Sequence, residues 1–194
     1  MASADNQPDY IIIGGGSAGC VLAARLSADP SCHVVLLEAG GEDYNPLIHI
    51  PAGYIKTMVN PAMNWMFETE PEEGTGNRRI AIPRGKVLGG SSAINAMLYV
   101  RGQSADYDDW AQRGNRGWSY DDVLPYFRKA EHCEPLANGN DDFDDKLHGV
   151  GGPLNVAEVR TRYEALDKLI EAAEAIGYPH NKDYNGNHME GVAV

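Results

Sequence analysis

The sequence predicts an α/β fold that begins with a strand, a glycine-rich turn, a helix and a second parallel strand. An apolar and β-branched run at Tyr10–Ile13 has the length of a buried parallel strand. Three glycines follow in the spacing G-x-G-x-x-G, and a helical apolar pattern runs from Ser17 to Leu26. A second apolar run, Val34–Leu37, ends in an acidic residue about 20 residues after the last of these glycines. This combination is typical of a Rossmann-like dinucleotide-binding unit.

The residue types in this turn match the chemistry of a pyrophosphate site. Gly14 permits a tight turn, Gly16 lets the backbone approach a phosphate, and Gly19 lets the helix lie close to the strand. The helix N-terminus adds free N–H groups and a positive dipole end. Glu38 stands where a carboxylate accepts hydrogen bonds from a ribose. The alternative, a βαβ turn without a ligand, is less favoured because every part of the motif occurs in its required order.

Composition limits the classes of function. The 194 residues are 43% hydrophobic and 23% charged, which predicts a packed core. The net charge is −12 without a compensating lysine or arginine run, which argues against nucleic acid as a partner. No apolar stretch has the length of a membrane span, and residues 1–9 do not resemble a signal peptide. Three cysteines without a C-x-x-C motif indicate reduced thiols and a cytoplasmic location.

Residues 41–76 are irregular and contain regularly spaced prolines. A segment of this length is either a surface excursion or a flap over a bound ligand, and its pattern does not decide between them. Alternation over residues 64–69 predicts one strand within it.

Residues 80–95 contain paired glycines followed by two serines in front of an expected helix. This pattern is a second anion-cradling geometry, although in isolation a Gly-Gly turn capped by a serine explains it better. G-x-x-x-x-G-K is absent, so the segment is not a Walker loop. Beside the first unit, we interpret it as a second wall of the same cofactor site.

The rest of the chain predicts three helices and a strand. One helix spans residues 104–113 with Ser104 as its N-cap, and a second begins at Ser119 and restarts at Pro125. A strand follows over residues 154–159, and a helix over residues 161–176 with a capping box at Thr161. The linker-like composition of residues 135–152 suggests a domain boundary. The six histidines form no sequence cluster, so we expect no metal site.

These segments resemble, in order along almost the whole chain, the N-terminal part of the glucose–methanol–choline (GMC) family of flavin oxidoreductases, most closely its choline-dehydrogenase-like members. The block RGKVLGGSSAIN at residues 84–95 is the most specific match. The other matching segments are residues 9–19, 37–40, 64–65, 99–102, 106–110, 117–118, 123–127, 148–149 and 152–153.

The resemblance implies a Rossmann-like FAD-binding domain over residues 1–151, with residues 41–76 as its cofactor lid, and the start of an α+β substrate-binding domain over residues 152–194. It implies FAD rather than a nicotinamide; the irregular stretch after Gly40 also disfavours an ordinary NAD-dependent dehydrogenase. The expected cofactor-binding residues are Gly14, Gly16, Ser17, Ala18, Gly19, Glu38, Ala39, Trp65, Arg84, Gly85, Val87, Gly89, Gly90, Ser91, Asn95, Ala96, Met97 and Tyr99.

Two features of the family bear on the chemistry. Some members attach FAD covalently through a histidine at the position of Ile94, so we expect a non-covalent flavin here. The family's catalytic histidine lies in a C-terminal region that does not match this chain, so we assign no catalytic residue within it. His148 is expected to be structural. The fold is expected to be incomplete without that C-terminal remainder, either a second chain or a missing segment.

The leading hypothesis is therefore the FAD-binding part of an oxidoreductase that oxidises an alcohol, a small-molecule substrate, to an aldehyde or ketone by hydride transfer to flavin. Two alternatives remain open. The same scaffold serves hydroxynitrile lyases and fatty-acid photodecarboxylases, and the chain alone is consistent with a non-catalytic nucleotide-binding fragment.

Overall fold

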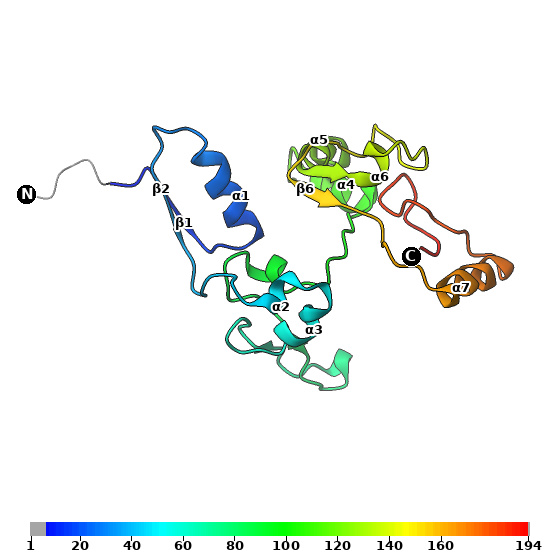
Figure 1. Cartoon of the computed structure of the whole chain (residues 1–194), viewed down its shortest axis with the longest axis horizontal. Coiled ribbons are helices and arrows are strands. Elements are labelled where there is room, and N and C mark those ends of the chain that lie inside the picture. The colour runs from blue at the N-terminus through cyan, green and yellow to red at the C-terminus, as the bar shows by residue number, and fades with distance from the viewer. Residues whose placement is uncertain (1–6, 194) are drawn as a thin grey trace, which may run out of the picture. The chain divides into compact units, whose positions relative to one another are not determined.

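The computed structural model describes residues 7–193 and divides them into two compact units (Figure 1). The first unit ends at Leu98, and the second begins at Tyr99. Most of residues 1–9, the segment expected not to be a signal peptide, lies outside the described residues. No helix in the described part of the chain is long and apolar enough to cross a membrane.

The first unit begins with the predicted strand–helix–strand motif. β1 (Tyr10–Ile13) and β2 (Val34–Leu37) pair in parallel, with Tyr10 opposite Val34 and Ile13 opposite Leu37. α1 (Ser17–Leu26) connects them and lies beside both strands (Figure 1). All three elements have the predicted bounds, because the apolar runs and the glycines mark each end.

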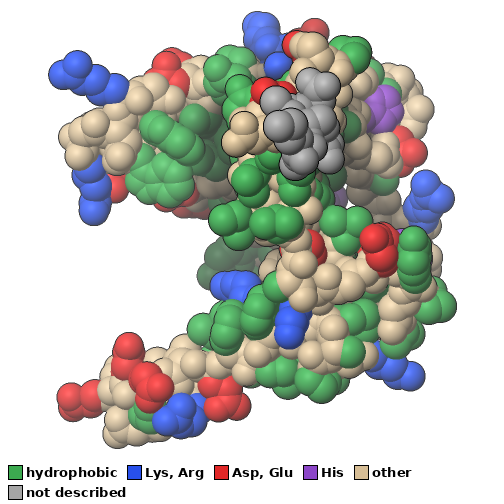
Figure 2. All heavy atoms as spheres, turned by 90° about the vertical axis from the view of Figure 1, so that its left-hand side faces the viewer, with side chains coloured by type: hydrophobic (Ala, Val, Ile, Leu, Met, Phe, Trp, Pro, Cys, Tyr) green, Lys and Arg blue, Asp and Glu red, His purple; other side chains and the backbone are tan. Residues whose placement is uncertain are grey.

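The strands are less buried than their apolar composition predicts. In β1 only Ile12 is buried, whereas Ile13 is 87% exposed. The sheet has two strands, and a parallel sheet buries its apolar side chains only when both faces are covered. Hydrophobic side chains are correspondingly exposed on the face drawn in Figure 2.

Residues 41–76 form short elements rather than one open loop. They comprise α2 (Pro46–His49), a 3₁₀ turn η2 (Pro51–Gly53), α3 (Tyr54–Thr57), β3 (Phe67–Glu68) and a second 3₁₀ turn η3 (Glu73–Thr75). β3 pairs antiparallel with β4 (Ala81–Ile82). The strand predicted over residues 64–69 is shorter because Met66 has a φ of +56°, which interrupts the extended backbone. After the paired glycines the chain makes only a 3₁₀ turn, η4 (Gly90–Ala93).

The second unit contains three longer helices and a short parallel sheet. Its elements are α4 (Ser104–Gln112), α5 (Tyr120–Ala130), β5 (Glu131–Cys133), α6 (Glu134–Ala137), β6 (Leu154–Val156) and α7 (Glu164–Ala175). β5 pairs with β6 in parallel, from Glu131 opposite Leu154 to Cys133 opposite Val156.

Three details of the helix ends differ from prediction. The N-cap of α4 is Gln103, whose N–H donates to Asp106 Oδ2 over 2.8 Å, so Ser104 is the first helical residue. α5 begins after Ser119, which forms a capping box with Asp122, but the helix continues through Pro125 without a restart, and the proline removes one backbone hydrogen bond. α7 begins after Tyr163 without a side-chain cap.

The β5–β6 pairing joins residues on both sides of the expected domain boundary after residue 151. That boundary therefore lies within the second compact unit, which begins at Tyr99. The assignment of residues 1–151 and 152–194 to two functional domains stays a prediction.

Candidate functional site

The glycine-rich turn depends on glycine for two separate reasons. Gly14 has a φ of +97°, and its N–H donates to the Leu37 carbonyl over 2.7 Å at the carboxyl end of β2. A Cβ on Gly19 would lie 1.9 Å from the Gly14 carbonyl oxygen. Glycine at position 19 is thus what lets α1 pack against the end of β1.

The N-terminus of α1 has unoccupied hydrogen-bond donors. Its N-cap residue, Gly16, provides no side-chain cap, and the first turn contains no acidic residue. The first amides of the helix therefore keep their N–H groups and the positive end of the helix dipole for an anion.

Glu38 is held by two backbone donors beside this turn. Gly15 N–H donates to Oε2 over 2.6 Å, and Gly40 N–H donates to Oε1 over 2.8 Å. A carboxylate has about four acceptor positions, so this half-buried group can still accept hydrogen bonds from hydroxyl donors. A vicinal diol such as that of a ribose fits this acceptor.

The second glycine-rich segment packs on the first, backbone against backbone. Gly89 N–H donates to the Gly15 carbonyl over 2.7 Å, and a Cβ on Gly90 would lie 2.7 Å from the Gly16 Cα. A Cβ on Gly85 would lie 2.0 Å from the Gly90 carbonyl oxygen. The two segments, about 70 residues apart in the sequence, thus form one surface in which side chains are excluded.

Aromatic and cationic side chains stand beside this surface. The rings of Trp65 and Phe67 are stacked, with centroids 5.8 Å apart and an interplanar angle of 5°. Lys86 Nζ lies 4.7 Å from the centroid of the Trp65 ring. Arg84 is exposed, and its guanidinium donates to the Pro83 carbonyl over 2.7 Å. The group offers a planar apolar face and positive charge, which suit a nucleotide base and phosphates.

These features surround one cavity of about 690 Å³. The predicted site residues that line it are Gly14, Gly16, Ser17, Glu38, Ala39, Trp65, Arg84, Gly85, Gly90 and Ser91. The predicted residues that do not line it are Ala18, Gly19, Val87, Gly89, Asn95, Ala96, Met97 and Tyr99. Gly19 lies beneath the turn, Val87 is buried, and Tyr99 belongs to the second unit.

Ile13, Leu37 and Phe67 also line the cavity and were not predicted. Ile13 and Leu37 are the last residues of β1 and β2. Ligands of parallel sheets bind beyond the carboxyl ends of the strands, so the strand ends alone could have indicated these two residues.

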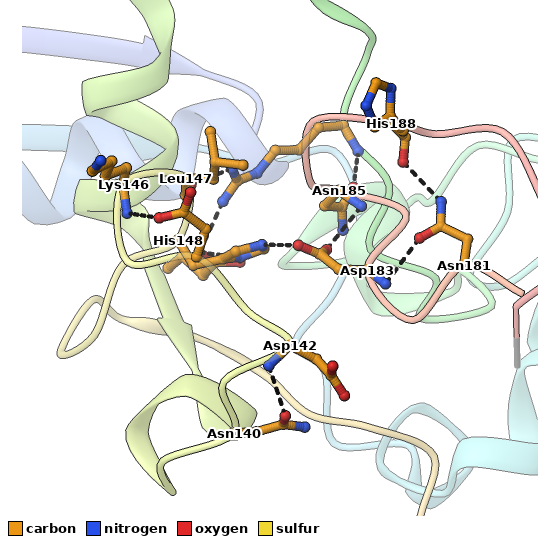
Figure 3. A network of polar contacts seen from close by, with 12 residues as sticks. Asn140, Asp142, Lys146, Leu147, His148, Asn181, Asp183, Asn185 and His188 are labelled. Carbon is orange, nitrogen blue, oxygen red and sulfur yellow. Dashed lines mark hydrogen bonds and ion pairs between the residues drawn. The ribbon is translucent and has the colours of Figure 1, made fainter.

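The second unit contains a buried cluster of four charged side chains (Figure 3). Arg101 Nη2 donates to Glu131 Oε2 over 2.8 Å. His148 lies between two carboxylates, with Nδ1 3.1 Å from Glu131 Oε1 and Nε2 3.0 Å from Asp183 Oδ2. Arg101, Glu131 and His148 are each at most 4% exposed. The two cations and two anions balance, which is the condition under which such groups tolerate burial. This environment is that of a buried ion-pair network, and the expectation that His148 is structural stays a prediction.

The cluster has perturbed titration behaviour. Burial alone would lower the pKa of His148, but hydrogen bonds to Asp183 and Glu131 raise it to about 9. Burial would raise the pKa of Glu131, but the hydrogen bonds from His148 and Gly149 and the charge of Arg101 hold it below its usual value. Both groups are therefore ionised at neutral pH, with His148 as a double donor.

We expect the second unit to lose stability in alkali. The folded-state pKa of His148, about 9, exceeds its usual 6.5. The contribution of the charged imidazole to the free energy of unfolding is therefore complete below about pH 6.5 and disappears as pH rises through 9. The loss amounts to roughly 3 kcal/mol at about 1.4 kcal/mol per pKa unit. Urea unfolding between pH 6 and 10 measures it, and a His148→Gln variant should lack this alkaline decline. An equally steep decline in that variant would assign the effect to another group.

Glu131, Cys133 and His148 place candidate metal-ligand atoms within 4.8 Å of one another. Sequence spacing concealed this cluster, because Cys133 and His148 lie on segments that only tertiary packing brings together. Glu131 and His148 already bind each other and two further charged groups, so the balanced cluster requires no ion. The expectation of no metal site stays a prediction.

Comparison with known proteins identifies the relatives of this chain. Residues 8–194 match a family model described as GMC oxidoreductase. An oxygen-dependent choline dehydrogenase from Photobacterium profundum is 47% identical over 186 residues, which cover 94% of this chain and 31% of that protein. An alcohol dehydrogenase [acceptor] from Pseudomonas putida is 45% identical, and the matching residues cover 32% of that protein. The chain thus spans about a third of the length of these relatives.

Solved structures agree with this result. Pyridoxine 4-oxidase from Mesorbium loti superimposes with a TM-score of 0.84 and 36% sequence identity, covering 95% of this chain and 35% of that one. A formate oxidase superimposes with a TM-score of 0.81 and 28% identity, over 95% of this chain and 33% of that one.

Proposed function

Because the chain belongs to the GMC oxidoreductase family, we propose that it is the FAD-binding N-terminal part of an enzyme that oxidises an alcohol to an aldehyde or ketone. Relatives and structural neighbours are named dehydrogenases and oxidases, and one neighbour is named an FAD-dependent oxidoreductase. The observation that carries the proposal is the convergence of two glycine-rich segments and Glu38 on one cavity.

The residues present fit an FAD molecule. The cavity-lining Gly14 and Gly16 leave bare backbone for the pyrophosphate, and the free amides at the start of α1 bind its charge. Glu38 accepts the adenosine ribose hydroxyls while Gly15 and Gly40 hold its carboxylate in place. Trp65 and Arg84 line the same cavity. The flavin supplies the hydride acceptor, and the chain contributes binding and orientation.

The cofactor is held without a covalent bond. Ile94, at the position where some family members attach FAD, is a hydrocarbon side chain that is 3% exposed. The catalytic base and most of the substrate site belong to a C-terminal remainder, and the substrate is a small-molecule alcohol. Residues 1–151 form the FAD domain with residues 41–76 as lid, and residues 152–194 begin the substrate domain. A cytoplasmic location accords with the free state of Cys20, Cys32 and Cys133.

A visible spectrum of the full-length protein tests the cofactor. We expect flavin absorption in the purified protein, and after denaturation the yellow colour should pass through a filter that retains the polypeptide. Colour retained on the polypeptide would contradict non-covalent binding, and a protein that cannot be reconstituted with FAD would refute the proposal itself. Addition of an alcohol should bleach the flavin of the full-length protein, whereas bleaching by residues 1–194 alone would place catalysis within this chain.

A further inference from the structure

Asn64 lies between α3 and β3 and is only 3% exposed. Its carboxamide bonds to three separate backbone segments. Nδ2 donates to the Met58 carbonyl at the end of α3. Oδ1 accepts two amide hydrogens, from Met66 over 3.0 Å and from Arg84 over 2.9 Å. One side chain therefore connects the end of α3, the start of β3 and the segment that follows β4.

The backbone beside Asn64 needs this support. Met66 has a φ of +56°, a left-handed conformation that residues other than glycine rarely adopt. The bond from its amide to an asparagine two residues earlier is an Asx turn, which stabilises such a backbone locally. Asn64 also forms an isolated antiparallel bridge with Gly85, and the neighbouring Trp65 N–H donates to the Arg84 carbonyl over 2.9 Å.

The residues that Asn64 places are two of the predicted cofactor-binding residues that line the cavity. Trp65 follows it in the chain, Arg84 is bonded to it, and both line the cavity of about 690 Å³, whereas Asn64 does not. We propose that Asn64 is a positioning residue for FAD, which sets Trp65 and Arg84 at the distance that the cofactor requires. This inference rests on the proposed function, because it names FAD as the occupant.

The position requires a short side chain with both an acceptor and a donor. Leucine has a similar shape but would leave the two amides and the Met58 carbonyl without this partner in a buried place. An ionised aspartate accepts from both amides but repels the Met58 carbonyl. A protonated aspartate supplies the acceptor and, through its hydroxyl, the donor, so it reproduces the asparagine.

The first experiment separates positioning from stability. In the full-length apoprotein, Asn64→Leu should raise the Kd for FAD about tenfold or more, measured by quenching of flavin fluorescence. The matched control is Leu147→Ala, which truncates a buried side chain of the second unit, outside the cavity and outside residues 41–76. It should lower the midpoint of thermal unfolding but leave the Kd unchanged. If Asn64→Leu and the control variant lost the same FAD affinity for the same decrease in the midpoint of thermal unfolding, the proposal would be overturned.

The second experiment is a rescue by pH, and it applies even if Asn64→Leu does not fold. Burial and the facing Met58 carbonyl raise the pKa of the carboxyl introduced by Asn64→Asp, whereas its two amide donors, Met66 and Arg84, lower it. An NMR titration of that carboxyl gives its pKa in the variant. Relative to wild type, the variant should bind FAD poorly above this pKa and almost normally below it, and a ratio to wild type that stays constant across the measured pKa would overturn the inference. A wild-type protein that binds no FAD would instead refute the proposed function.

Discussion

Replacing Glu131 by glutamine is expected to lower the free energy of unfolding by about 3–5 kcal/mol, the cost of breaking a buried ion pair by removing one partner. The carboxylate is fully buried and accepts from Arg101, His148 and the Gly149 amide. Without its charge, the cations Arg101 and His148 are left with Asp183 as the single anion of the cluster. The same change should lower the pKa of His148 from about 9. Urea unfolding and titration of the imidazole by NMR measure the two effects.

Glu134→Gln is the matched control for this variant. Glu134 lies three residues further along the chain, its side chain is 36% exposed, and its ion-pair partner Arg160 is 4.0 Å away. An exposed pair of this kind contributes about 1 kcal/mol or less. If the two glutamine variants unfolded at the same urea concentration, the buried cluster would not be stabilising the second unit.

Gly19→Ala is expected to abolish high-affinity FAD binding and to destabilise the first unit. The added Cβ would lie 1.9 Å from the Gly14 carbonyl oxygen, and a backbone atom cannot move aside as the end of a flexible side chain can. α1 must therefore shift away from β1, which removes its N-terminal amides from the pyrophosphate position. Overpacking of this kind costs about 1–3 kcal/mol, and a backbone clash belongs at the upper end of that range.

The control for Gly19→Ala is Gly74→Ala, where the added Cβ meets nothing within 4 Å. That change should leave the Kd for FAD unaltered and alter stability by less than about 1 kcal/mol. Urea unfolding and FAD titration of both variants in the full-length protein provide the comparison. Normal FAD affinity in Gly19→Ala would show that the close packing of α1 on β1 is not needed for the cofactor.

Local sequence pattern was sufficient for the elements whose ends are marked by nearby residues. The apolar runs at Tyr10–Ile13 and Val34–Leu37 and the helix at Ser17–Leu26 have the predicted bounds. Pattern was insufficient where the backbone departs from regular geometry. The left-handed Met66, whose amide donates to the Asn64 side chain, shortens a predicted strand. α5 passes through Pro125, which removes one backbone hydrogen bond of the helix.

The sequence by itself determined the βαβ unit, the family and most of the residues that line the cavity. Only the tertiary structure decided that Gly89 and Gly90 dock on Gly15 and Gly16, that Asn64 joins three segments, and that His148 is enclosed by two carboxylates. The physical reason is the distance along the sequence between the residues in contact. Periodicity and capping report on neighbours a few residues apart. The contacts of Gly89 with Gly15, of Asn64 with Arg84 and of His148 with its two carboxylates join residues separated by 17 to 74 positions, and only packing of the folded chain brings them together.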